Sequence, residues 1–184
     1  LAKLGAPVDL VGAVGDDLLG RQYGALLSRL GIGDDHIAIR TDMTTGTASI
    51  EVADSGENHI IVVAGANQSV TIDYVESMQT AIRQAVLLLL QMEIPLPSVL
   101  RAAQIAANSN VPVILDPAPA QRLPPDLYPL VSVLTPNEHE AEVLTGEDTH
   151  DEAGIARAGA ILLKRGVRYV IIKAGSMGAY LIDH

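Results

Sequence analysis

The chain has 184 residues, of which 48% are hydrophobic, and its formal net charge is −10 at pH 7. This apolar content is enough for the core of one domain and argues against intrinsic disorder. The negative charge and the absence of Phe and Trp argue against binding to nucleic acid or to an anionic membrane, because phosphate groups would be repelled and aromatic stacking platforms are missing.

The sequence contains no Cys, which removes disulfides, thiolate nucleophiles and Cys zinc sites and is typical of the reducing cytoplasm. No apolar run is long enough to span a membrane, and no signal peptide is visible. The first residue is Leu1, in what reads as the end of a helix. We therefore expect a cytoplasmic location and an internal part of a longer protein.

Apolar strand-like runs alternate with helical patterns along the chain. Runs that are apolar on both faces are typical of parallel strands covered by helices. The expected strands are Val8–Val14, Val86–Gln91, Val111–Asp116, Val131–Thr135 and Tyr169–Lys173. The expected helices are Leu18–Gly31, Ile72–Ala85, Ser98–Asn108, Pro136–Leu144 and Glu152–Arg165. This order predicts one α/β domain over residues 1–184, a three-layer sandwich with a mostly parallel, Rossmann-like sheet.

One segment interrupts this alternation. Residues Gly46–Gly65 alternate between apolar and polar side chains in their first half, and the four letters DSGE stand in the middle. This pattern predicts an antiparallel β-hairpin inserted into the parallel domain. Such a hairpin is either a lid or interface element, or a plain surface excursion, and the pattern alone does not choose.

The stretch LTPNEHEAEVLTG contains an expected helix start. Thr135 to Glu138 has the S/T-x-x-E form of a capping box, with Thr135 as N-cap, Pro136 at the first helical position and Glu138 reaching back. Acidic residues in a first turn also suit the helix dipole. This interpretation gives Glu138 a structural role.

Asn137 and Glu140 are three residues apart and share a helix face at the carboxyl end of the strand Val131–Thr135. Ligands of open α/β sheets bind at that edge, and a helix N-terminus there attracts phosphate. A carboxylate beside phosphate suggests a divalent cation between them. The alternative is a well-capped helix without a ligand.

Other strand ends carry further candidates, each with a structural alternative. Asp116 either lines a site or starts a turn before Pro117, and Glu93 either binds a polar ligand or caps the strand end. The Gly175–Gly178 stretch reads on its own as a hairpin turn, and Asp16 and Asp17 read as helix caps. The sequence contains no dinucleotide G-x-G-x-x-G, no P-loop and no paired His spacing.

Six stretches, taken together and in order, resemble the ribokinase-like (PfkB-type) carbohydrate kinases over nearly the whole chain. The matching stretches are VGAVGDDLLG, HIIVVAGAN, LLLLQMEIP, DPAPAQRLP, LTPNEHEAEVLTG and IIKAGSMGAY. The resemblance is strongest to the ribose-specific members. It implies a transferase that moves the γ-phosphoryl group of ATP to the primary hydroxyl of D-ribose, giving ribose 5-phosphate.

The resemblance also implies roles for single residues. Glu140 would match the family's N-x-x-E acid, which organises Mg²⁺ and phosphate, and Glu93 would accept hydrogen bonds from sugar hydroxyls. The hairpin would be a lid over the sugar, with Ile50 packing on it, and the lids of two copies would pair to form a homodimer. The nucleotide would contact Asn137, Lys173, Gly175, Ser176 and Gly178.

Two family segments have no counterpart in the sequence: the N-terminal strand with its Gly-rich sugar-binding stretch, and the D-T-x-G-A-G-D segment that carries the catalytic Asp. The resemblance places them before Leu1 and beyond His184, the latter together with a monovalent cation (K⁺) site. We therefore expect this stretch alone to be inactive. Two alternatives stay open: another sugar or nucleoside kinase of the family, and a non-catalytic α/β module that dimerises through the hairpin.

Overall fold

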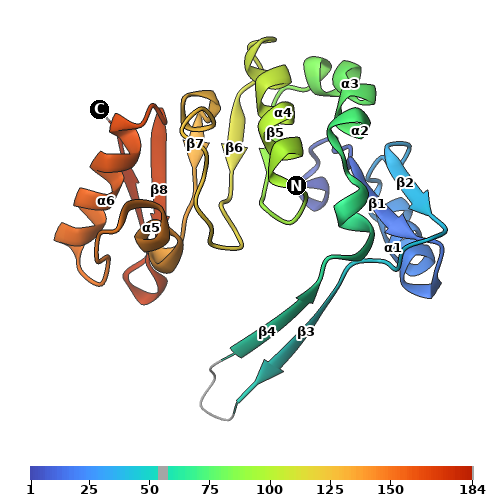
Figure 1. Cartoon of the computed structure of the whole chain (residues 1–184), viewed down its shortest axis with the longest axis horizontal. Coiled ribbons are helices and arrows are strands. Elements are labelled where there is room, and N and C mark those ends of the chain that lie inside the picture. Colours follow the sequence, from blue (N-terminus) through green and yellow to red (C-terminus); the bar gives the residue numbers. More distant parts are fainter. Residues whose placement is uncertain (54–57, 184) are drawn as a thin grey trace. The chain divides into compact units, whose positions relative to one another are not determined.

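The computed structural model describes residues 1–53 and 58–183 (Figure 1), which form two compact units. The first unit comprises the described residues of Leu1–Tyr74, and the second comprises those from Val75 onward.

The first unit is built around a β-α-β crossover. Strand β1 (Gly12–Gly15) pairs in parallel with strand β2 (Ile37–Arg40), and helix α1 (Leu18–Leu30) connects them. Asp17 caps the start of α1 by accepting a hydrogen bond from the Gly20 N–H, as the sequence predicts. Two short 3₁₀ helices, η1 (Ala2–Leu4) and η2 (Gly65–Ser69), belong to the same unit.

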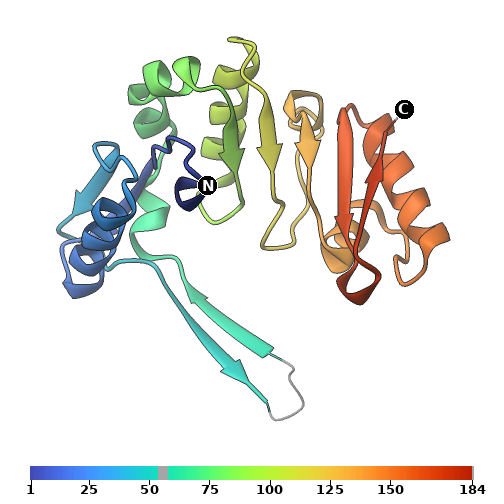
Figure 2. The ribbon, with the colours of Figure 1, turned by 180° about the vertical axis from the view of Figure 1, so that it is seen from behind.

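The hairpin predicted over Gly46–Gly65 is present as an extended two-stranded arm in Figures 1 and 2. Strand β3 (Thr47–Val52) pairs antiparallel with β4 (Asn58–Val63), so that Ile50 lies opposite Ile60. The DSGE stretch at residues 54–57, where the turn is expected, lies outside the described residues.

The second unit contains a five-stranded mixed sheet in the order β5-β6-β7-β8-β9 (Figure 2). The first four strands are parallel, and β9 is antiparallel to β8. The strands are β5 (Leu88–Leu90), β6 (Val113–Leu115), β7 (Val133–Leu134), β8 (Tyr169–Lys173) and β9 (Ala179–Ile182). The helices are α2 (Ile72–Ser77, which begins in the first unit), α3 (Gln79–Gln84), α4 (Leu96–Ala107), α5 (Glu138–Thr145) and α6 (Glu152–Lys164), with the 3₁₀ helices η3 (Tyr128–Leu130) and η4 (Gly175–Met177).

The core of the second unit lies between this sheet and its helices. In β8, Val170 and Ile172 are fully buried while Tyr169 and Ile171 are partly exposed, because successive side chains of a strand point to opposite faces. The buried helix residues that join them in one core cluster include Val99, Ala103, Ile155, Ala158 and Leu162. This packing holds the strand ends, and the loops that follow them, in fixed positions.

The α/β fold with a mostly parallel sheet and an inserted hairpin is confirmed, with differences in detail. The helix predicted over Ile72–Ala85 is divided into α2 and α3, because Met78 leaves helical geometry at φ −95° and ψ 5°. Strands β2 and β9 were not predicted. Within the described residues, no helix has the length and apolarity that a membrane span requires.

Candidate functional site

Four residues at one edge of the second unit lie at or just after the carboxyl ends of four neighbouring strands. Glu93 comes after β5, Asp116 after β6, Asn137 after β7, and Lys173 ends β8. Because these strands are parallel, their carboxyl ends meet at one edge of the sheet, where ligands of such folds bind. The outer two strands are three inter-strand spacings apart, or roughly 14 Å. The four residues are therefore spread along the edge and not clustered at one point.

The helix that follows β7 begins with a reciprocal pair of side chains. The Asn137 side chain accepts a hydrogen bond from the Glu140 N–H at 2.7 Å, and the Glu140 carboxylate accepts from the Asn137 N–H at 2.7 Å and from its amide Nδ2 at 3.0 Å. Glu140 is only 5% exposed, whereas Asn137 is exposed at the edge. Asn137 and Glu140 therefore form the capping box of α5.

The predicted capping box at Thr135 and Glu138 is therefore wrong. The Thr135 N–H donates to the Leu115 carbonyl at 3.0 Å, which continues the hydrogen-bond ladder between β6 and β7. The N-cap is instead Asn137, two residues further along the chain, where the backbone is extended (φ −80°, ψ −179°) and the side chain accepts from the Glu140 N–H. Glu138 is half-buried, and its Oε2 lies 3.7 Å from the place where a Cβ of Gly175 would be.

Lys173 joins two of the strand ends. Its Nζ donates to both carboxylate oxygens of Asp116, at 3.1 and 3.0 Å, and its backbone N–H donates to the Pro136 carbonyl at 2.9 Å. The Lys173 and Asp116 side chains are 45% and 44% exposed, so both stay accessible to a ligand. Sequence reasoning did not find this pair, because a separation of 57 residues leaves no local pattern.

A tight turn follows Lys173 and leads into β9. Gly175 and Gly178 have positive φ angles of 49° and 91°, which favour glycine, and the Ala174 N–H donates to the Gly178 carbonyl at 2.8 Å. Ser176 is exposed within the turn. The structure thus brings together all the residues predicted to contact nucleotide, although their roles stay a prediction.

The two residues predicted to contact sugar lie in different units. Glu93 is exposed in the bend after β5, at the same edge as Asp116. Ile50 lies on the hairpin and is 59% exposed. Their roles also stay a prediction. No group of three or more His, Cys, Asp or Glu side chains in the described ranges is arranged to hold a metal ion by itself.

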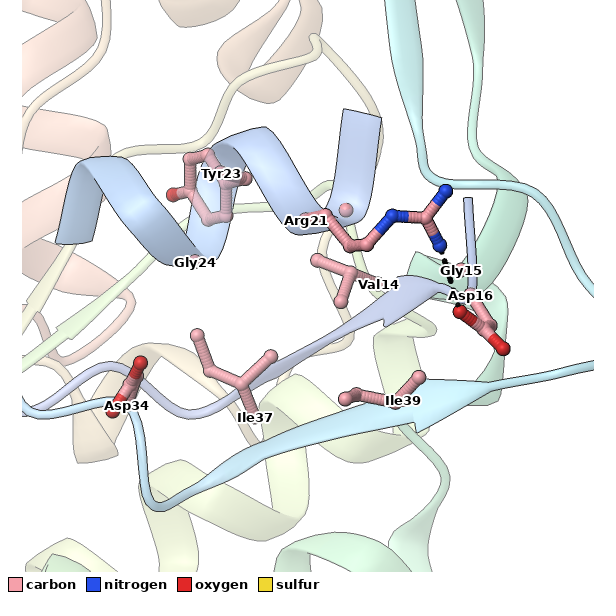
Figure 3. Close-up of a pocket in the computed structure, with 10 residues that line it drawn as sticks. Val14, Gly15, Asp16, Arg21, Tyr23, Gly24, Asp34, Ile37 and Ile39 are labelled. Atoms are coloured by element: carbon pink, nitrogen blue, oxygen red, sulfur yellow. Dashed lines mark hydrogen bonds and ion pairs between the residues drawn. The ribbon is translucent and has the colours of Figure 1, made fainter. Parts of the chain in front are cut away.

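A concavity lies within the first unit, between α1 and the β1–β2 pair (Figure 3). Its lining is mostly apolar and includes Val14, Ile37 and Ile39. The charged pair at its rim, Arg21 and Asp16, is joined at 3.0 Å. The cavity contains none of the predicted site residues, so the edge of the second unit is the better candidate for the reaction site.

Known proteins match the chain over nearly all its length. Ribokinase from Haemophilus influenzae is 38% identical over 180 residues, which is 98% of this chain and 59% of that protein. Ribokinase from Mus musculus is 36% identical over 183 residues, which is 99% of this chain and 57% of that protein. The structure of Arabidopsis thaliana ribokinase complexed with ribose and ATP superposes with a TM-score of 0.88 at 33% identity, covering 100% of this chain and 60% of that one.

The chain therefore spans less than two thirds of the length of the curated relatives that it matches. A family model described as pfkB family carbohydrate kinase matches residues 1–184. On the strength of that match, the chain belongs to the pfkB family of carbohydrate kinases.

Proposed function

We propose that the complete protein containing this chain phosphorylates D-ribose at its primary hydroxyl with MgATP. The observation that carries the proposal is the single sheet edge in the second unit. There Glu93 stands at one end, after β5, and Lys173 with the glycine turn stands at the other, after β8. The similarity to a ribokinase solved with ribose and ATP, which extends over the whole chain, supports the same assignment.

In this proposal, the β8 end of the edge binds the nucleotide. The Lys173 ammonium supplies positive charge next to the phosphates, and the turn from Gly175 to Gly178 lets backbone groups approach the nucleotide closely. Phosphoryl transfer depends mostly on positioning and charge stabilisation. A lysine and a tight backbone turn at one strand end meet both needs.

Glu140 is the carboxylate that we propose for magnesium. Each of its oxygens accepts a hydrogen bond from Asn137 but keeps a further lone pair, so the carboxylate can also order water. This arrangement fits Mg²⁺, which keeps several of its waters and binds few protein carboxylates directly. When bound, the ion neutralises charge that develops on the phosphate oxygens. We also propose that the complete protein depends on K⁺, as the resemblance implies.

A coupled assay of ADP release tests the substrate. The complete protein is given MgATP with D-ribose, 2-deoxyribose, hexoses or nucleosides in parallel. We expect the highest kcat/KM for D-ribose. A nucleoside preferred over ribose would contradict the substrate assignment while leaving the family assignment intact, and no ADP release with any acceptor would favour a non-catalytic module.

We also propose that two copies of the protein associate through the hairpin. The pairing of β3 with β4 places Ala48, Ile50, Val52, Ile60 and Val62 on one face, and all five are exposed. A two-stranded hairpin is marginally stable in water by itself, so an apolar face of this kind needs a cover. A second copy of the same face is self-complementary and covers the part of it that does not cover the sugar.

The molar mass of the complete protein, measured by light scattering during size-exclusion chromatography, tests this association. Ile60→Asp places a charge on the apolar face and should convert a dimer into a monomer. Ile61→Asp is the matched control, because Ile61 pairs with Ser49 on the opposite face and is equally exposed, at 51% against 50% for Ile60. A dimer that survives Ile60→Asp would contradict the proposed interface.

A further inference from the structure

The base of the hairpin is fastened to the β1–α1 turn by one carboxylate. Asp17 Oδ2 accepts a hydrogen bond from the Thr45 N–H at 2.7 Å, and Asp17 Oδ1 accepts from the Thr45 hydroxyl at 2.7 Å. The same Oδ1 accepts from the Gly20 N–H at 2.8 Å. The Thr45 hydroxyl oxygen in turn accepts from the Gly15 N–H at 3.0 Å. Asp17 therefore links the start of α1 to the segment that enters β3.

Glycines allow the backbones to approach closely at this junction. A Cβ on Gly15 would lie 2.6 Å from the Thr45 nitrogen, and a Cβ on Gly20 would lie 2.2 Å from the Gly15 oxygen. A Cβ on Gly65, which has a φ of +51°, would lie 2.3 Å from the Thr44 oxygen. Because all three distances are shorter than any ordinary Cβ contact, the junction admits no side chain at these positions.

The segment that enters β3 and the segment that leaves β4 are hydrogen-bonded to each other next to Thr45. The Ala66 N–H donates to the Thr44 carbonyl at 2.8 Å, one residue before the Thr45 that Asp17 holds. Among the described residues, the main packing partners of β3 and β4 are each other. The direction of the arm is therefore set mainly at its root, which we define as residues 44–46 and 64–66.

The charge of Asp17 strengthens this attachment. Hydrogen bonds from the Thr45 and Gly20 N–H groups and from the Thr45 hydroxyl lower the pKa of Asp17 to about 2, so it is ionised at neutral pH. Hydrogen bonds to a charged acceptor are shorter and stronger than neutral ones. The Asp16 carboxylate turns instead toward Arg21 on the surface (Figure 3). Two adjacent aspartates thus have separate roles.

A small rotation at the root becomes a large movement at the far end of the arm. A six-residue strand is roughly 20 Å long, so a rotation of about 10° moves its far end by roughly 3 Å and its fourth residue by roughly 2 Å. A displacement of this size breaks the contacts between a lid side chain and a small ligand. Ile50, the side chain expected to cover the sugar, lies on this arm.

We propose that Asp17 is a positioning residue, which orients the hairpin through Thr45 and thereby sets the affinity of the kinase for its sugar. This inference rests on the proposed function, in which the hairpin covers ribose. Asp17 acts through Thr45 and the arm, without contact to the reacting atoms. Its loss should therefore affect the sugar more than the nucleotide.

The test compares D17N with D16N in the complete protein. Asn is also a good N-cap, so D17N preserves α1, but it replaces Oδ2 by an amide that cannot accept from the Thr45 N–H. We expect the KM for ribose to rise about tenfold, the size expected for one lost hydrogen bond to a charged group, while the KM for ATP changes less than about twofold. D16N, which removes only an exposed ion pair, should leave both values unchanged.

Hydrogen–deuterium exchange supplies a readout that does not depend on activity. Amides in peptides covering the root should exchange faster in D17N than in D16N, and T45V should reproduce D17N while T45S restores slow exchange. If D17N does not fold, T45V still tests the inference, because it removes the hydroxyl that donates to Asp17. Unchanged exchange and unchanged ribose KM in both D17N and T45V would overturn the inference. A protein that phosphorylates no sugar refutes the proposed function, and the exchange comparison then decides by itself whether Asp17 holds the root.

Discussion

Asn137 and Glu140 cap each other across the first turn of α5, and the same two residues are the ones proposed to act at the ligand edge. The acid proposed to organise magnesium is thus held in place by the amide beside it. A side chain with a fixed orientation loses little entropy when the ion binds. Stability and chemistry are therefore coupled at this helix start.

Glu140→Gln should lower both stability and activity of the complete protein. A Gln can accept from the Asn137 N–H with its one oxygen, but its NH₂ group then faces the Asn137 NH₂ group. We expect a loss of about 0.5–2 kcal/mol in the free energy of unfolding, measured by urea denaturation. Glu138→Gln is the control, because Glu138 is outside the capping box and should change stability by less than about 0.5 kcal/mol. Equal losses in the two variants would refute this assignment.

Lys173→Met should damage nucleotide binding with little cost in stability. The ion pair with Asp116 is almost half exposed, and such pairs contribute only about 0–1 kcal/mol. We therefore expect the KM for ATP to rise about tenfold and the melting temperature to stay close to that of the wild type. Lys164→Met, at the exposed end of α6, should change neither value. An unchanged KM for ATP in Lys173→Met would remove this lysine from the nucleotide site.

The contribution of Asp17 to stability should depend on pH in a defined direction. Its pKa is lowered from 3.8 to about 2 in the folded protein, so folding favours the ionised form. The stabilisation is therefore complete above about pH 4 and disappears as the pH falls toward about 2. Urea denaturation of the wild type and D17N should show a stability difference that shrinks as the pH is lowered from about 4 toward about 2. A difference that stays constant over this range would show that the charge of Asp17 has no part in it.

Local patterns in the sequence predict the buried strands and the helix positions well. The strand Tyr169–Lys173 has the predicted bounds, because a continuous apolar run between polar turns is a strong signal. The helix cap was mispredicted, because Thr135-x-x-Glu138 and Asn137-x-x-Glu140 both fit a capping pattern. The folded structure distinguishes them, because the Glu140 N–H donates to the Asn137 side chain while Thr135 continues the strand pairing of β7 with β6.

The contacts that connect distant parts of the chain could not be predicted. Asp17 and Thr45 are 28 residues apart, and Asp116 and Lys173 are 57 apart. Periodicity describes which face of an element is buried, but it does not say which polar groups meet when elements pack. The residues of both pairs lie at strand ends or next to glycines. That position is the one local signal that could have marked them as candidates for such contacts.

The most direct test of the proposed function is ³¹P NMR identification of the product formed from D-ribose and MgATP. Three samples are compared: the complete protein, its Asn137→Ala/Glu140→Gln double variant, and the isolated 184-residue chain. We expect ribose 5-phosphate from the complete protein and a large loss in the double variant. The resemblance implies a catalytic Asp outside this stretch, and on that expectation the isolated chain should form no product, since removal of a general base costs roughly 10²–10⁴-fold in rate. Robust formation of ribose 5-phosphate by the double variant, or by the isolated chain, would contradict the proposed placement of the catalytic machinery.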